Sequence, residues 1–265
     1  MFLERILKTK RQEVAGLQIK TSLNQLEKMA AAIPMCRGFE QALRNGRKIN
    51  GLGLIAEVKK ASPSKGLVRE NFHPVTLAQS YERAGAHCLS VLTDETYFQG
   101  KAEYLQRIKQ EVGLPILRKD FVIDPYQVYE SKVLGADAVL LIAAALDKPI
   151  MEICLREAKA LGLDVLIEIH NREQLEEILN LNHSLIGINN RNLHTFETSL
   201  QTTKDLIPLL PDDIFVISES GIHSGEDLKF VLSAGAGGVL IGEYFMRQEN
   251  VEKAVKKLMQ ALLSV

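Results

Sequence analysis

The sequence lacks the features that mark membrane and secreted proteins. No apolar run approaches the roughly 18 residues that a membrane-spanning helix needs. Residues 1–12 are charged and amphipathic and contain no long apolar core, so they do not resemble a secretory signal. The acidic Glu4 and Glu13 disfavour a membrane-surface role for this segment. We therefore expect a cytoplasmic protein that does not associate with membranes.

The sequence is also poor in candidate metal ligands. Cys36, Cys88 and Cys154 are odd in number and far apart, and they match no metal-ligand spacing. Cys88 and Cys154 lie among apolar neighbours, which favours buried free thiols and a reducing compartment. The histidines are scattered and form no helical pair, and they predict no metal site and no Ser–His–Asp arrangement: His73, His87, His170, His183, His194 and His223.

Neither positively nor negatively charged residues are in excess. The 32 Lys and Arg residues nearly balance the 33 Asp and Glu residues, giving a net charge of −1. No general basic field therefore points to nucleic acid, although a local positive cluster could bind a small anion. The chain has 265 residues, of which 46% are hydrophobic and 25% charged. This length and mixture suit one α/β barrel or two small domains with a sizeable core.

Residues 1–50 differ from the rest of the chain in their helical pattern. A second helical stretch covers about residues 22–32, with Ser22 as a candidate N-cap and Pro34 beyond its end. We interpret this region as a helical extension that docks on a main body. The apolar residues of its first stretch recur at helical spacing among lysines and arginines: Leu3, Ile6, Leu7, Val14 and Leu17.

From residue 52 onward, short apolar runs alternate with amphipathic helical stretches. Continuous apolar runs are typical of parallel strands that are covered on both faces. Eight runs are candidate strands: 54–58, 88–92, 115–117, 138–142, 165–169, 185–188, 215–217 and 239–241. Helical stretches fall between them, among them 75–84, 126–134, 150–161, 172–179 and 226–233.

A weak internal repeat favours a closed barrel. Gly85-Ala86, Gly135-Ala136 and Gly235-Ala236 each precede an apolar run, at spacings of two and four units of about 25 residues. A glycine that ends a helix before a strand is the expected joint of a βα unit. We predict a single-domain (β/α)8 TIM barrel over 1–265, with the N-terminal helical extension. An open doubly wound sheet is the alternative, but no Gly-x-Gly-x-x-Gly fingerprint follows the first strand.

Polar residues gather where the predicted strands end, which is where a barrel of this kind has its active site. Residues two apart on a strand point the same way, so Glu57 pairs in direction with Lys59, and Lys119 with Phe121. Burying a carboxylate within an apolar run is costly unless it is paired or functional. The strand ends therefore predict one charged face: Glu57, Lys59, Lys119, Glu168, Asn189, Arg191 and Glu219.

The last two strand ends carry a signal for phosphate. Ser220-Gly221 follows the seventh predicted strand and Gly242 follows the eighth, where many barrels bind phosphate. Glycine lets the backbone approach an anion, and free N–H groups hold it. Arg191 can add a charge-assisted contact. Each glycine alone could simply make a tight turn, but together they predict a phosphorylated ligand.

Four stretches resemble the signatures of the indole-3-glycerol phosphate synthase family: IAEVKKASPSKG at 55–66, LRKDF at 117–121, GINNRNL at 187–193 and SESGI at 218–222. The resemblance covers nearly the whole chain, including the N-terminal extension. It implies a carboxy-lyase of tryptophan biosynthesis. Such an enzyme closes the indole ring of 1-(2-carboxyphenylamino)-1-deoxyribulose 5-phosphate with loss of carbon dioxide and water. It implies no cofactor or metal, and it names this phosphorylated substrate as the partner. The oligomeric state stays open, with a monomer favoured, and so does association with other enzymes of the same pathway.

The resemblance also implies roles for single residues. Lys119 would be the general acid for ring closure, and Lys59 would lie near the substrate carboxylate as a further proton donor. Glu168 would stabilise developing positive charge and serve in the dehydration. The remaining three charged or polar residues would hold the lysines and the sugar hydroxyls: Glu57, Asn189 and Glu219.

The same resemblance implies the contacts with substrate. The phosphate site would comprise Ser62, Arg191, Ser220, Gly221 and Gly242, and the aromatic ring would lie against Phe98 and Phe121. Glu243 departs from a small hydroxyl residue that is frequent at this position. Its backbone N–H can still donate, but its carboxylate must point away from the phosphate or contact another group. Two other functions remain open: a different sugar-phosphate barrel enzyme, such as a phosphoribosylanthranilate isomerase, and a non-catalytic barrel that binds a phosphorylated ligand.

Overall fold

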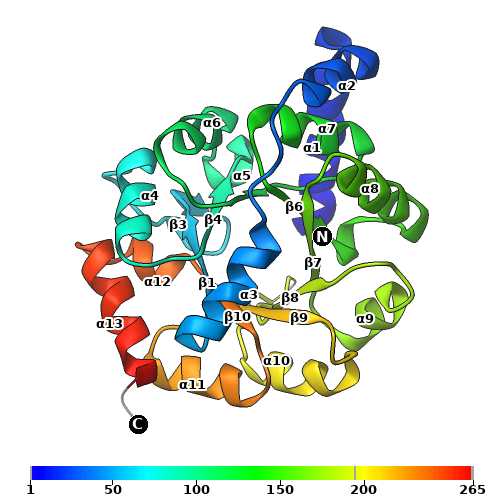
Figure 1. Cartoon of the computed structure of the whole chain (residues 1–265). Coiled ribbons are helices and arrows are strands. Elements are labelled where there is room, and N and C mark those ends of the chain that lie inside the picture. The colour runs from blue at the N-terminus through cyan, green and yellow to red at the C-terminus, as the bar shows by residue number, and fades with distance from the viewer. Residues whose placement is uncertain (1, 194, 264–265) are drawn as a thin grey trace.

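The computed structural model describes residues 2–193 and 195–263, so His194 of the sequence analysis lies outside the described residues. Eight parallel strands close into a barrel in the order β1-β10-β9-β8-β7-β6-β5-β4 (Figure 1). This closure confirms the predicted (β/α)8 barrel and rules out the open sheet. The barrel strands are β1 (Gly53–Val58), β4 (Cys88–Leu92), β5 (Ile116–Lys119), β6 (Ala138–Ile142), β7 (Asp164–Ile169), β8 (Leu185–Asn189), β9 (Phe215–Glu219) and β10 (Gly238–Ile241).

Three strands run further toward the site than predicted. Lys119, Asn189 and Glu219 are the last residues of β5, β8 and β9, whereas the apolar runs ended one or two residues earlier. Main-chain pairing explains the difference: Lys119 is in register with Leu92 of β4, and Asn189 with Glu219. Hydrogen bonding between backbones continues regardless of side-chain polarity. The polar side chains are therefore fixed by strands and not by loops.

Helices surround the barrel in the intervals between strands, as the predicted helical stretches required. The outer helices are α4 (Pro74–Arg83), α6 (Ala102–Glu111), α7 (Pro125–Leu134), α8 (Lys148–Ala160), α9 (Arg172–Ile178), α10 (Gln201–Leu206), α11 (Gly225–Ser233) and α13 (Val251–Leu263). Shorter turns lie between them: α5 (Glu95–Phe98), α12 (Glu243–Met246), η1 (Ala143–Ala145) and η2 (Ile207–Leu209). Within residues 2–193 and 195–263, no helix is long and apolar enough to cross a membrane.

The glycines of the internal repeat end helices as predicted. Gly85, Gly135 and Gly235 follow α4, α7 and α11 with φ angles of 88°, 90° and 107°. This left-handed region strains residues that carry a Cβ atom, which is why glycine occurs at these joints.

The alternation of side chains along the strands divides the barrel into an inner and an outer core. Apolar residues that point inward fill the barrel axis, and their sequence neighbours pack outward against the helices. On β1, for example, Ile55 belongs to the inner cluster, while Leu54 and Ala56 belong to the outer one. The next inward position after Ile55 is Glu57, so the same alternation that builds the core also places a carboxylate above it.

Two of the three cysteines are buried thiols, as predicted. Cys88 lies inside the barrel and Cys154 on the buried face of α8, and neither forms a disulfide. Burial raises the pKa of the Cys154 thiol to about 12. These two side chains therefore pack as small apolar residues.

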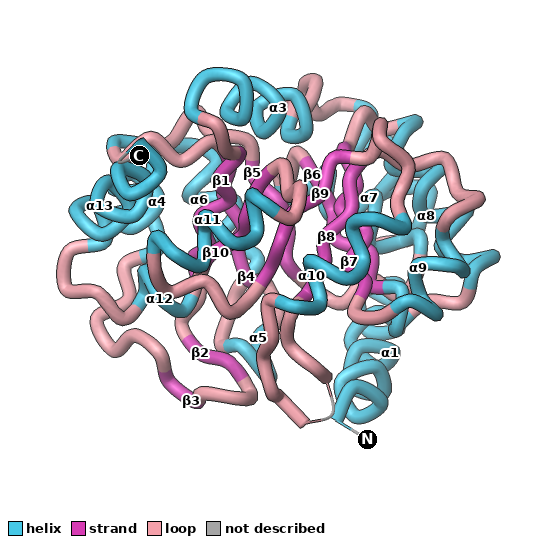
Figure 2. The backbone as a smooth tube through the Cα atoms, turned by 90° about the horizontal axis from the view of Figure 1, so that it is seen from below, coloured by secondary structure: helices cyan, strands magenta, loops and turns pink. Residues whose placement is uncertain are grey.

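The N-terminal extension covers both ends of the barrel. It consists of α1 (Phe2–Lys20), α2 (Leu23–Ala31) and α3 (Phe39–Asn50). Figure 2 shows α3 across the end where the strands begin, and α1 beside the opposite end together with the hairpin β2 (Ala61–Ser62) and β3 (Gly66–Leu67). Fully buried Phe39 and Leu43 of α3 belong to the inner core. α3 was not predicted as a separate helix, because its apolar residues are few.

A buried lysine anchors α1 to the barrel. Lys10 is only 4% exposed, and its Nζ lies 3.1 Å from Asp94 and 2.8 Å from Asp120, at the ends of β4 and β5. Burial lowers the pKa of Lys10, but the two aspartates outweigh burial and raise it. Burial likewise raises the pKa of Asp120, but Arg118 and Lys10 overcome this and hold it at about 2. Lys10 and Asp120 are therefore both charged at neutral pH.

Replacing Lys10 by methionine should destabilise the fold. The substitution keeps much of the volume but leaves two carboxylates buried with one cation fewer, which typically costs about 3–5 kcal/mol. We expect a clearly lower urea midpoint for Lys10→Met. Lys8→Met, at an exposed position of the same helix, should unfold like the wild type. Equal midpoints for both variants would show that the anchor does not hold α1.

Candidate active site

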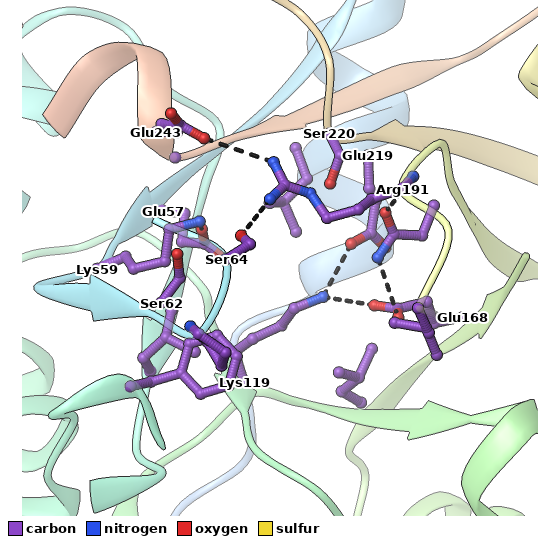
Figure 3. A pocket seen from close by; sticks show the side chains of 18 of the residues that line it. Glu57, Lys59, Ser62, Ser64, Lys119, Glu168, Arg191, Glu219, Ser220 and Glu243 are labelled. Atoms are coloured by element: carbon purple, nitrogen blue, oxygen red, sulfur yellow. Dashed lines mark hydrogen bonds and ion pairs between the residues drawn. The ribbon is translucent and has the colours of Figure 1, made fainter. Parts of the chain in front are cut away.

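A cavity opens where the barrel strands end (Figure 3). All eight barrel strands contribute residues to its lining, together with loops that follow them. All of the site residues that the sequence suggested line this one cavity: Glu57, Lys59, Ser62, Phe98, Lys119, Phe121, Glu168, Asn189, Arg191, Glu219, Ser220, Gly221, Gly242 and Glu243. Their individual roles remain predictions.

Lys119 lies between two glutamates at the centre of the cavity. Its Nζ donates to Oε2 of Glu168 at 2.7 Å and to Oε2 of Glu219 at 2.8 Å (Figure 3). The three side chains come from β5, β7 and β9, and strand pairing fixes each backbone position. A third donor position of the ammonium group is left for a ligand.

The charges of this cluster oppose one another. Burial lowers the pKa of Lys119, but Glu168, Glu219 and Glu57 outweigh it, so the pKa lies above its usual range and the lysine is charged. Burial raises the pKa of Glu168, and Lys119 and His170 reverse this and hold it below the usual range. For Glu219, burial and the neighbouring Glu168 prevail over Lys119 and raise the pKa to about 7. Two carboxylates with separated pKa values suit one acid and one base.

Glu168 has further partners that fix its other oxygen. Asn189 Nδ2 donates to Oε1 at 3.2 Å, and Nε2 of His170 lies 3.3 Å from the same atom. His170 was among the histidines for which no site was predicted. Its position two residues after Glu168, and therefore on the same side of the chain, was the available signal.

Lys59 and Glu57 form a second ion pair. Nζ of Lys59 lies 2.5 Å from Oε2 of Glu57, as the shared direction of the two side chains predicted. Both residues line the cavity. The site therefore presents two ammonium groups, each with a carboxylate partner.

Two glycines, Gly187 in β8 and Gly242 directly after β10, make room for these carboxylates. A Cβ atom at Gly187 of β8 would overlap Oε1 of Glu219, and one at Gly242 would overlap Oε2 of Glu57. Oε1 of Glu219 is buried and has no hydrogen-bond partner in the described part of the chain. Gly242 was expected at the phosphate site; it lines the cavity, and it also accommodates Glu57.

One wall of the cavity is apolar. Phe98 and Phe121 lie with ring centroids 6.1 Å apart. Phe2, Leu3 and Ile6 of α1 complete this wall. Leu3 and Ile6 were predicted on the apolar stripe of a docking helix, but their position at the site was not predicted. Contacts between residues so distant in the chain leave no local pattern.

The loops after β1, β8, β9 and β10 form the polar rim. Arg191 donates through Nη1 to Oγ of Ser64, and its Nη2 lies 3.4 Å from Oε2 of Glu243 (Figure 3). Ser220 and Gly221 both adopt left-handed conformations, with φ angles of 66° and 83°. The Glu243 carboxylate thus contacts another group, one of the two outcomes expected for it. In the part of the chain that is described, no three His, Cys, Asp or Glu side chains gather in a way that could hold a metal ion.

The barrel and this cavity define a class: a (β/α)8-barrel enzyme with paired lysines and glutamates at its strand ends. Solved structures with low sequence identity share the fold. 3-Hexulose-6-phosphate synthase from Salmonella typhimurium superposes with a TM-score of 0.62 at 14% identity, covering 80% of this chain and 99% of that one. KGPDC from Streptococcus mutans gives 0.61 at 15% identity, covering 80% and 97%.

The sequence comparisons are more specific. Residues 3–258 match the family model of indole-3-glycerol phosphate synthase. A protein of that name from Geobacillus kaustophilus (strain HTA426) is 51% identical over 97% of this chain and 96% of its own length. Another, from Geobacillus thermodenitrificans (strain NG80-2), is 50% identical with the same coverage. The chain belongs to the indole-3-glycerol phosphate synthase family.

Adding a methyl group at Gly187 should disable the site while the barrel persists. Gly187→Ala would force Glu219 away from Lys119, and we expect kcat to fall more than tenfold, with a loss of stability of about 1–3 kcal/mol. Steady-state kinetics and urea unfolding measure the two effects. Gly16→Ala is the control, because its Cβ meets no atom within 4 Å. Full activity in Gly187→Ala would show that the space beside Gly187 is not needed to hold Glu219 against Lys119.

The raised pKa of Glu219 should appear in the pH dependence of stability. The folded protein keeps this proton up to about pH 7, whereas the unfolded chain releases it near its usual pKa of 4.5. Its stabilising contribution is therefore complete below pH 4.5 and is lost as the pH rises through 7. Relative to Glu219→Gln, the wild type should lose about 1–3 kcal/mol between pH 5 and pH 8. Urea midpoints of both proteins across this pH range test the prediction. A stability difference between the wild type and Glu219→Gln that does not change with pH would refute the raised pKa of Glu219.

Proposed function

We propose that the chain closes the indole ring of 1-(2-carboxyphenylamino)-1-deoxyribulose 5-phosphate and releases carbon dioxide and water. The observation that carries this proposal is the position of Lys119, a charged donor held between two glutamates in a cavity with one apolar and one cationic wall. The family membership supports the same reaction, a carboxy-lyase step of tryptophan biosynthesis. It also disfavours a phosphoribosylanthranilate isomerase or another sugar-phosphate enzyme.

The first step joins the sugar carbonyl carbon to the ring carbon that carries the carboxylate. The carbonyl oxygen gains negative charge as this bond forms. We assign Lys119 the role of donating to that oxygen, because its ammonium group is charged and fixed by β5. A preformed charge of this kind lowers the barrier without reorganisation at the moment of reaction. Acid catalysis of this type typically contributes about 10²–10⁴-fold to the rate.

Loss of carbon dioxide follows from the same carbon. The carbon–carboxylate bond breaks and its electron pair restores the aromatic ring. Lys59 would hold the carboxylate before this step, and the Phe98–Phe121 wall would keep the ring in a site without water. A desolvated carboxylate is more easily lost than a hydrated one.

The final step removes water. The hydroxyl group formed in the first step leaves with a proton from a donor, and the neighbouring CH₂ group loses a proton, which completes the indole. Glu168 would stabilise the positive charge that develops at the ring nitrogen and take part in these transfers. Glu57, Asn189 and Glu219 would hold the lysines and the sugar hydroxyls, consistent with their contacts to Lys59, Glu168 and Lys119.

The phosphate would bind at the rim. Arg191 supplies the cation, and the loops at Ser62, Ser220-Gly221 and Gly242 supply backbone donors beside it. We further propose a cytoplasmic location, in accord with free thiols at all three cysteines. A monomer remains the favoured oligomeric state.

Removing the ammonium group of Lys119 should abolish ring closure. The purified protein, mixed with the substrate in metal-free buffer, should produce indole fluorescence. Lys119→Ala should keep a native circular dichroism spectrum, with a lower urea midpoint because Glu168 and Glu219 lose their shared cation. It should lose at least about 10²-fold in kcat. Lys48→Ala, exposed on α3 at the opposite end of the barrel, is the matched control. An intact protein that binds phosphate but gives no indole would overturn the proposed reaction.

A further inference from the structure

The cation proposed to receive the phosphate already has an anionic partner. Nη2 of Arg191 lies 3.4 Å from Oε2 of Glu243, and its Nη1 donates to Ser64 (Figure 3). Both Arg191 and Glu243 line the cavity and are only partly exposed. A phosphate that approaches this guanidinium group therefore meets a carboxylate next to it.

Glu243 is charged and held in place by other cations. Its Oε1 accepts from Nε of Arg247 at 3.0 Å and lies 3.8 Å from Nζ of Lys65. Burial raises the pKa of Glu243, but Arg247, Lys65 and Arg191 outweigh burial and hold it below its usual range. The carboxylate therefore does not escape competition by becoming protonated at neutral pH.

Carboxylate and phosphate compete for the same donors. Both accept charge-assisted hydrogen bonds from the fork of a guanidinium group. A bound phosphate must either displace Glu243 from Arg191 or remain beside it, and both alternatives cost binding free energy. A Glu243 carboxylate that is displaced from Arg191 can keep its hydrogen bond from Arg247.

We propose that Glu243 acts as an internal competitor of the phosphate group and weakens the binding of every phosphorylated ligand of the cavity. The proposal rests on the phosphate site of the proposed function. Because substrate and product carry the same phosphate, Glu243 weakens both equally. Glu243 thus speeds dissociation of the phosphorylated product and lowers the affinity for substrate.

Glu243→Gln tests the proposal, because it removes the charge and keeps the shape. We expect the dissociation constant for inorganic phosphate, measured by calorimetry, and the KM for substrate to fall together by about three- to tenfold. kcat should stay constant or decrease. Glu111→Gln is the charge-matched control; it is exposed at the end of α6, where the helix meets the start of the next strand. It should leave both constants unchanged.

Two results would overturn the proposal. Unchanged phosphate binding in Glu243→Gln would show that no competition exists. Weaker binding would show that Glu243 only positions Arg191. A second variant, Arg191→Met, tests the phosphate site itself and should weaken phosphate binding at least tenfold. Phosphate binding at the wild-type level in Arg191→Met would place the phosphate elsewhere, even if ring closure is intact.

Discussion

The buried ion cluster at the centre of the site is the interaction on which the rest of the structure depends. Lys119 contacts Glu168 and Glu219 within 3 Å, and each of these side chains would be costly to bury alone. The barrel meets this cost by closing its strands into a ring, so that side chains from β5, β7 and β9 converge on one point. Gly187 leaves the space for the second carboxylate. The core beneath the cluster is apolar, which strengthens the electrostatic interactions above it.

The N-terminal extension links the stability of the fold to the shape of the cavity. Lys10 joins α1 to Asp94 and Asp120, and Asp120 lies between Lys119 and Phe121 in the sequence. The same helix places Phe2 and Ile6 on the apolar wall. At the other end, α3 fills the opening of the barrel with Phe39 and Leu43. The extension that was predicted to dock on the main body therefore also forms part of the site.

Strand order and the polar strand ends could be predicted because they depend on local patterns. Continuous apolar runs identified the eight strands, repeated glycines identified the helix–strand joints, and alternation gave the shared direction of Glu57 and Lys59. The anchor at Lys10 and the contact between Arg191 and Glu243 could not be predicted. Both join residues more than 50 positions apart, and a lysine or glutamate in an amphipathic helix has the same local pattern whether it is buried or exposed.

The central claim is that Lys119 donates to the carbonyl oxygen of the substrate while Arg191 holds its phosphate. A crystal structure with an analogue whose carbonyl is reduced to an alcohol tests this most directly, because the analogue cannot react. We expect the alcohol oxygen within about 3 Å of Nζ of Lys119 and the phosphate at Arg191. An alcohol oxygen beyond hydrogen-bonding distance of Lys119, with the phosphate still at Arg191, would contradict it.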